Sequence, residues 1–170
     1  MDCTVRVGEL GVSATAALRV IDALVAGFDE ATEPLGVLAP RIHDGPVVND
    51  GGSNISLVVG VSNPADRDEA ASVDAVQEWA HANTLRRDES GSVACVLSIT
   101  SQAGSLSACR EDAGVILDAL TAWLRMHTDL GLSDVFWAAA ITRVDVYQQQ
   151  DDAGAYCDVR FSVAYKARLT

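Results

Sequence analysis

Two short runs of charged residues carry the strongest signal for ionic recognition. The first comprises Arg86, Arg87, Asp88 and Glu89, and the second comprises Asp66, Arg67 and Asp68. In both runs acids stand beside the bases and compete for the arginines, which disfavours a phosphate site. An arginine fork instead suits the carboxylate of a partner, which it binds through two parallel hydrogen bonds. We therefore predict contacts between subunits at both runs, with a solvated turn as the competing interpretation of the first.

The histidines are scattered and lack a metal-binding spacing. His43 stands beside Asp44 in a loop, as in half of a metal site or of a catalytic dyad, although exposed pairs of this kind are usually inert. His81 and Cys95 together supply too few ligands for zinc. His127 falls in the last turn of a predicted helix, where a cation complements the helix dipole. We therefore expect no metal site.

The cysteines indicate core thiols rather than a site. Cys3, Cys95, Cys109 and Cys157 are far apart, and no C-x-x-C occurs. This predicts reduced thiols, with the last three filling core positions. The sequence also lacks G-x-S-x-G, a P-loop and G-x-G-x-x-G, the usual marks of a nucleophile elbow or a nucleotide site. The sequence therefore carries only weak candidates for catalytic chemistry.

Composition favours a single globular domain spanning residues 1–170. The 170 residues are 49% hydrophobic and 21% charged, with a net charge of −12. Such a charge makes direct DNA binding improbable, because phosphates are bound by Lys and Arg. The first residues lack a basic segment followed by an apolar one, so no signal peptide is predicted. The longest apolar run, residues 135–141, is far shorter than a membrane span, and we expect a protein made in the cytoplasm.

Two helices are predicted from periodicity. Leu18, Ile21, Val25 and Phe28 share one face of a helix over residues 14–29, with Ser13 as a candidate N-cap. A longer helix follows Ser105 and stops at Gly131. Its apolar stripe comprises Leu106, Cys109, Ala113, Ile116, Leu120, Trp123, His127 and Leu130. A long loop is predicted over residues 31–53, which contain three prolines and four glycines.

Five strands are predicted, at residues 55–62, 72–79, 93–100, 135–149 and 155–168. With the helices they give the order α-β-β-β-α-β-β and an α/β (α+β) fold, in which two helices pack on a single mixed or antiparallel sheet. Trp79, Trp123 and Phe161 are the expected core anchors. The last two strands meet in a hairpin turn at residues 151–154, where Gly154 supplies a positive φ.

Two further segments are candidates for contacts with partners. The hairpin strands are long enough for their tip to project, and the tip carries Gln148, Gln149, Gln150, Asp151 and Asp152. Residues 1–12 form an N-terminal arm in which Val5 and Val7 alternate with polar residues. This alternation suits a short edge strand added to a neighbour, although a frayed terminus is the simpler interpretation.

The order and spacing of these segments resemble a known family. The first helix, LRVIDALVAGFDE, is followed by a DGPVV loop and the strand LVVGVS. The segment VQEWAHANTLRRDES then leads into an apolar strand, and a long Ala-rich helix precedes closing strands that end in FSVAYKARL. With these features the chain resembles the tail terminators of long-tailed actinobacteriophages, the group similar to minor tail protein U. The N-terminal arm is extra to that pattern, and the AHANTL turn lacks the glycines expected there.

The resemblance implies a structural virion protein at the junction of tail and neck. Such a subunit forms a sixfold ring on the last disc of the tail tube, ends tube growth, and offers a surface to the head-side connector protein. It has no catalytic activity and no cofactor. DNA would pass through the lumen without specific binding, and we expect the inner wall to be net negative. The alternatives are another neck, head-completion or connector protein and, more remotely, a small metal-dependent hydrolase that uses His43 and Asp44.

Overall fold

The computed structural model of the chain describes residues 14–46, 53–62, 72–80, 86–102, 104–152 and 154–169, without the side chains of residues 136–139. Its elements are α1 (Ala17–Thr32), the 3-10 helix η1 (Glu33–Leu38), β1 (Arg41–Asp44), β2 (Ile55–Val59), β3 (Val73–Trp79), β4 (Arg87–Ser101), α2 (Leu106–Met126), β5 (Val135–Asp151) and β6 (Gly154–Leu169). The fold is α+β, with two α-helices and one mixed sheet, which confirms the predicted class.

Within the described residues the sheet has six strands rather than five. The additional strand, β1, lies in the segment predicted as a loop and pairs in parallel with β2. It is only four residues long and lies between Pro40 and Gly45, so no alternation of apolar and polar residues marks it in the sequence. The rest of the predicted loop, residues 47–52, lies outside the described residues.

The long strand β4 organises the sheet. One of its edges pairs with β6 along the whole strand, from Arg87 to Ser101. The other edge is shared: β3 pairs with residues 87–93, and β2 pairs with residues 95–99. The sheet order is β1-β2-β4-β6-β5, with β3 beside β4, and every pairing except that of β1 with β2 is antiparallel.

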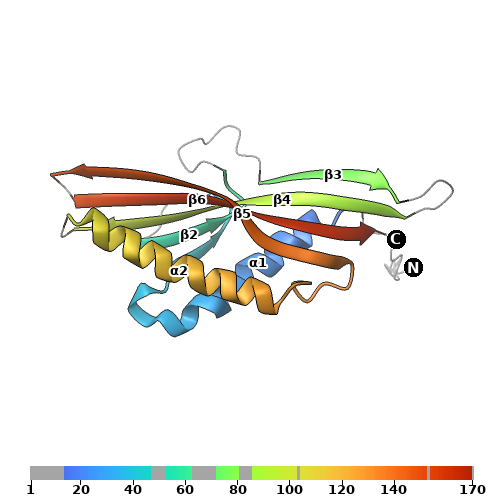
Figure 1. Cartoon of the computed structure of the whole chain (residues 1–170), viewed down its shortest axis with the longest axis horizontal. Coiled ribbons are helices and arrows are strands. Elements are labelled where there is room, and N and C mark those ends of the chain that lie inside the picture. The colour runs from blue at the N-terminus through green and yellow to red at the C-terminus, as the bar shows by residue number, and fades with distance from the viewer. Residues whose placement is uncertain are drawn as a thin grey trace, which may run out of the picture.

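Both α-helices cover the same face of the sheet (Figure 1). Between helices and sheet lies one apolar core, to which β6 contributes every second residue from Ala155 to Leu169, as its alternation predicts. The predicted stripe of α2 is confirmed from Cys109 to Leu120, and the Ser105 hydroxyl caps the helix by accepting from the Ala108 amide at 3.2 Å. In the described part of the chain no helix lies on the opposite face, here called the open face.

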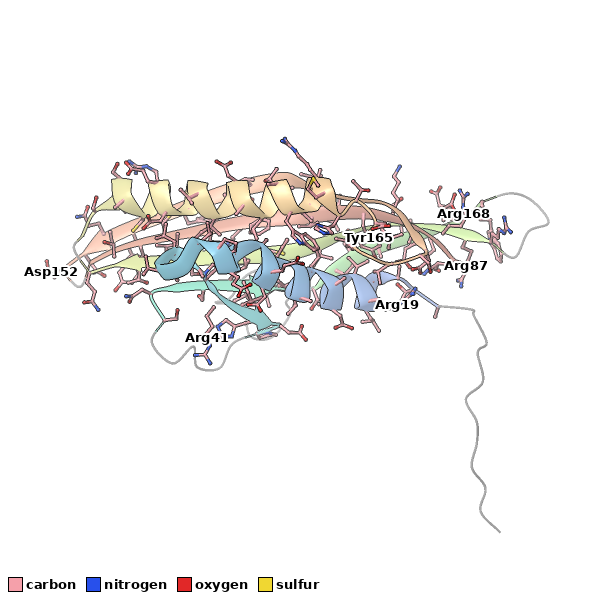
Figure 2. All side chains as sticks on the ribbon, turned by 90° about the horizontal axis from the view of Figure 1, so that it is seen from below. Arg19, Arg41, Arg87, Asp152, Tyr165 and Arg168 are labelled. Atoms are coloured by element: carbon pink, nitrogen blue, oxygen red, sulfur yellow. The ribbon has the colours of Figure 1, made fainter. Side chains whose placement is uncertain are left out.

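The β5–β6 hairpin forms one end of the molecule. Asp151 pairs with Gly154, whose φ of 142° confirms the predicted glycine turn. A side chain at Gly154 would also lie 2.6 Å from the Ser101 carbonyl oxygen. The start of α2 lies beside this tip, because the Gln150 side chain donates to the Gly104 carbonyl at 2.7 Å. Arg87 and Arg168 mark the opposite end, where the strands continue beyond the helices (Figure 2).

Candidate interaction surfaces

Glu89 is fully buried, so within the 86–89 run it is available neither for the predicted contact between subunits nor as part of a solvated turn. Its position in β4 turns the carboxylate toward the helix side of the sheet, where α1 begins. One oxygen, Oε1, accepts from the Ala16 amide at 3.0 Å and from the Tyr165 hydroxyl at 2.9 Å. The other oxygen, Oε2, accepts from the side-chain amide of Gln77 at 2.7 Å. Glu89 therefore joins the start of α1 to β3 and β6, and its negative charge complements the positive end of the helix dipole.

The hydrogen bonds decide the charge state of this carboxyl. Burial disfavours the ionised form, but the donors outweigh burial and hold the pKa of Glu89 below its ordinary value. These donors are the Thr15, Gln77 and Tyr165 side chains and the Ala16 amide. Burial and then Glu89 itself raise the pKa of Tyr165, so the phenol stays protonated as a donor. Hydrogen bonds therefore hold the Glu89 carboxylate in place, out of contact with solvent.

Gly91 makes room for this network. It is paired with Tyr165 across β4 and β6, and a side chain on Gly91 would lie 2.5 Å from the tyrosine ring. The Tyr165 ring therefore lies over the backbone of Gly91, and its hydroxyl reaches Glu89. A cross-strand aromatic ring also covers the backbone that a glycine leaves uncovered.

The remaining members of the 86–89 run have partners within the chain or are exposed. Arg87 donates to the Gln77 side chain at 2.8 Å. Asp88 and Arg168 are paired across β4 and β6 and form two parallel hydrogen bonds, at 2.8 and 3.1 Å. The bidentate geometry predicted for a contact between subunits thus occurs within one subunit. Arg86 is exposed just before β4. A contact between subunits at Arg86 and at the half-exposed Asp88–Arg168 pair stays a prediction.

The other predicted contact residues fall into two groups. Asp66, Arg67 and Asp68 lie outside the described residues. Gln148, Gln149, Gln150, Asp151 and Asp152 are all exposed at the end of the β5–β6 hairpin. Gln148 accepts from Arg110 of α2 at 3.3 Å, so part of this group is engaged with the helix. The hairpin end therefore presents a polar, acidic surface beside the start of α2.

The three expected core anchors have different surroundings. Phe161 is 2% exposed, which confirms the prediction. Trp123 packs edge-on against Phe28 at 6.4 Å, in space left by Gly27, and is partly buried against the core. Trp79 is 66% exposed, so its assignment to the core was wrong. It ends an edge strand at a point that the helix layer does not cover, and alternation alone did not reveal that.

A cluster on the open face was not singled out by sequence reasoning. The guanidinium of Arg160 lies 4.2 Å above the ring of Tyr147, and its buried Nε has no hydrogen-bond partner. Arg143 and Asp145 form an ion pair at 2.8 Å beside them. Together they line a hollow of about 200 Å³. The alternation of β6 places Arg160 opposite the core face, but its partners depend on the pairing of β5 with β6.

His43 and Asp44 do not converge. They are consecutive in β1, so their side chains point to opposite faces of the sheet. Asp44 is exposed, whereas His43 is half-buried with its Nε2 buried and unpaired. His127 stacks on Trp123 with ring centroids 4.4 Å apart, and His81 lies outside the described residues. The adjacency of the two residues in the sequence therefore does not produce a dyad.

The cysteine prediction is confirmed for the described residues. Cys95, Cys109 and Cys157 are buried free thiols. Burial raises the pKa of Cys95 to about 12 and also raises the pKa of Cys157, so these thiols are poor nucleophiles. Cys3 lies outside the described residues.

Searches of the described residues for two kinds of site gave negative results. They contain no group of three or more His, Cys, Asp or Glu side chains that could hold a metal ion. None of the helices described is long and apolar enough to cross a membrane. Comparison of the sequence with models of known families and with curated proteins found no match. The described surfaces include strand edges that no described strand pairs with and an open face that carries charges of both signs.

Proposed function

We propose that this protein is a tail terminator, a structural subunit that caps the tail tube of a long-tailed phage as a ring. The observation that carries the proposal is the arrangement of the sheet edges. One outer edge of the sheet is formed by β5, and the opposite edge is formed by β1 and β3. No described strand pairs with the outer edge of β3 or of β5. Different edges on opposite sides suit head-to-tail contacts, which form a ring when the rotation between successive subunits closes.

The strand directions support the same arrangement. From β3 through β4 and β6 to β5, each strand is antiparallel to the one before it, so β3 and β5 run in opposite directions. In a ring whose symmetry axis runs parallel to the strands, rotation from one subunit to the next leaves the direction of each strand unchanged. The β5 edge of one subunit would therefore meet the opposite edge of the next in antiparallel orientation, the more stable pairing. Such a ring would continue the antiparallel pairing of the sheet from one subunit to the next.

The charge distribution supports a passage for DNA. Helices α1, η1 and α2 carry seven acidic and three basic residues, whereas β5 and β6 carry three acidic and four basic residues. A wall formed by the helix layer is net negative and repels DNA, as expected above. The open face carries both signs: Arg143 and Arg160 lie there with Asp145 and Asp158, and β3 adds Asp74 and Glu78. Of the two faces, the helix layer meets the condition for the lumen, and a ring whose channel is lined with arginine would contradict this assignment.

The partners that follow from the proposal are further copies of the chain, the tail tube protein and the head-side connector. Deletion of the gene from the phage that carries it tests the role directly. We expect tails of abnormal length that fail to join heads, visible by electron microscopy and restored by supplying the gene in trans. Normal tails that join heads without this protein would overturn the proposal.

A virion reconstruction separates the proposal from its nearest alternative. A ring on the last disc of the tube supports a terminator, whereas density on the head side of that ring identifies another neck or connector protein. The remote hydrolase alternative has its own test in a variant with both His43→Ala and Asp44→Ala. Because these side chains lie on opposite faces of β1, we expect phage assembly to be unchanged in this variant.

A further inference from the structure

The outer part of β5 is exposed at its edge and on both faces. Among the described strands β5 pairs only with β6, so no described strand lies along its outer edge. Val144 and Val146 pair with Phe161 and Val159, whose side chains lie in the core, yet they are 48% and 53% exposed. On the open face, Tyr147 is 50% exposed. Apolar side chains at such an edge favour contact with a further strand.

The strand pairing fixes the position of each edge residue along the strands, here called its height. Rows of paired residues cross the sheet from β1 through β2, β4 and β6 to β5. The row that begins at Ile42 passes through Leu57, Leu97 and Val159 and ends at Val146. The neighbouring rows join Arg41 to Tyr147, His43 to Asp145, and Asp44 to Val144. β1 and residues 144–147 of β5 therefore have the same height on opposite edges.

In the proposed ring, this equality of height sets a register. Rotation about an axis parallel to the strands keeps every residue at its height, so one end of a row meets the other end of the same row in the next subunit. Ile42 of one subunit would then lie opposite Val146 of the next. β1 runs parallel to β2 and β2 antiparallel to β4, so β1 has the direction of β3 and meets β5 in antiparallel orientation.

The other strand at this edge, β3, faces a less regular part of β5. Through β4 and β6, β3 has the height of residues 135–141 of β5. The pairing of β5 with β6 shifts three times between Val135 and Arg143, and it is regular from Arg143 to Asp151. Such irregularities bend a strand and interrupt its ladder. β1 therefore faces the regular half of β5, which is the better template for a further strand.

The side chains of the two stretches are complementary. On the helix side, Ile42, which packs against the core, would meet the half-exposed Val146. On the open face, β1 carries two bases and no acid. Asp145 would lie opposite His43 and diagonal to Arg41 on that face. Apolar pairs and pairs of opposite charge across strands both stabilise a sheet.

We propose that β1 of one subunit pairs with residues 144–147 of β5 in a second copy of the chain, in the register that sets Ile42 opposite Val146. This inference rests on the proposed ring and names the strands that join its subunits. Asp145 keeps its ion pair with Arg143 through Oδ2, and its other oxygen accepts from the bases of β1. The contact is head-to-tail, because each subunit contributes β1 on one side and β5 on the other.

Engineered disulfides test this register in the full-length protein. Ile42→Cys with Val146→Cys places both thiols in one row, and Ile42→Cys with Gln150→Cys is the matched control. Gln150 lies on the same face of β5 as Val146, four residues farther along. Within one subunit the two edges are four strand spacings apart, about 19 Å, so a disulfide joins two copies. Every variant also carries Cys3→Ser, and the other cysteines are buried.

A second pair uses exposed positions on the open face, so its variants leave the core intact. Arg41→Cys with Tyr147→Cys occupies the neighbouring row, and Arg41→Cys with Arg143→Cys is its control. Adjacent rows of an antiparallel ladder alternate between close and wide pairs. One of the two on-register pairs therefore brings its Cβ atoms within reach of a disulfide.

After oxidation with oxidised glutathione at millimolar protein, we expect a ladder of disulfide-linked dimers, trimers and larger species for an on-register pair. Its yield on non-reducing electrophoresis should be severalfold above that of the matched control. Each single variant should give no ladder, because one thiol per chain links at most two copies. Yields equal to the controls, or no ladder from either pair, would overturn the proposal. A stronger ladder from Ala75→Cys with Val146→Cys would assign the contact to β3 and overturn it as well.

The gene deletion distinguishes failure of this inference from failure of the proposed function. Abnormal tails in the deletion, together with no ladder, would overturn the β1–β5 contact alone. A ladder from a protein whose deletion leaves tails normal would support the contact and overturn the terminator role.

Discussion

Residues 95–99 and residues 87–93 belong to one strand, β4, yet their surroundings differ. The first stretch is paired with β2 and lies under both helices, where Cys95, Leu97 and Ile99 are buried in the apolar core. The second is paired with β3, beyond most of the helix layer. There a buried carboxylate, Glu89, holds the start of α1 through hydrogen bonds.

The difference shows how one strand combines two kinds of stabilisation. Apolar burial is non-directional and scales with the area removed from water, so the 95–99 stretch contributes mainly stability. The hydrogen bonds of Glu89 are directional, and removing the acceptor leaves buried donors unpaired. The 87–93 stretch therefore contributes the position of α1 on the sheet. Four experiments test this comparison, in order of expected effect.

The largest effect is expected in the apolar half. Leu97 is fully buried, and Leu97→Ala should lower the free energy of unfolding by about 3 kcal/mol, since it removes buried methyl groups and leaves a cavity. Equilibrium denaturation by urea measures the change. Leu18→Ala, at a residue that is 69% exposed, is the control. A loss under about 1 kcal/mol at Leu97 would show that the core is loosely packed there.

A smaller loss is expected for Glu89→Gln in the polar half. Glutamine keeps the shape but offers a single acceptor oxygen, so the Ala16 amide, Tyr165 and Gln77 cannot all be satisfied. We expect a loss of about 2 kcal/mol, together with earlier hydrogen exchange in the first turn of α1. Leu97→Ala is the comparison, because it should destabilise α1 only through global unfolding. Unchanged exchange at the start of α1 would contradict the positioning role of Glu89.

The pH dependence of stability follows from the lowered pKa of Glu89. Its folded pKa lies below the ordinary value of 4.5, so its contribution is fully present above that value and is lost as pH falls through the folded pKa. We expect the wild-type protein to lose more stability than Glu89→Gln between about pH 5 and pH 3. Thermal unfolding at each pH measures the two curves. If the stability of the wild-type protein and of Glu89→Gln changed equally with pH, the Glu89 carboxyl would have the same pKa in the folded and unfolded states.

The smallest effect is expected for Trp79→Ala, at the exposed end of β3. Its indole lies largely in solvent, so the free energy of unfolding should change by less than about 0.5 kcal/mol. Trp123→Ala is the matched variant, because Trp123 packs against Phe28 and fills the space beside Gly27; it should cost several times more. Equally large losses of stability in Trp79→Ala and Trp123→Ala would show that both side chains are packed in a core.

The long, regular elements were predictable from the sequence. The stripe of α2, the alternation of β6 and the glycine turn between β5 and β6 are local properties of the chain, and each survives in the structure. Cys157 and Phe161, both predicted in the core, lie on the buried face of β6, because every second side chain of a strand lies on the same side. The family resemblance adds a function that the fold itself does not test.

Only the tertiary structure decided what covers each face. The run Arg86 to Glu89 looks the same in the sequence whether it is a solvated turn or the end of a strand. Glu89 is buried because α1 and Tyr165 cover it, and both are more than 70 residues away in the sequence. Trp79 alternates like a core residue, yet the helix layer ends before reaching it. Periodicity reports which residues share a face; the covering of that face depends on contacts between distant segments, which no local pattern contains.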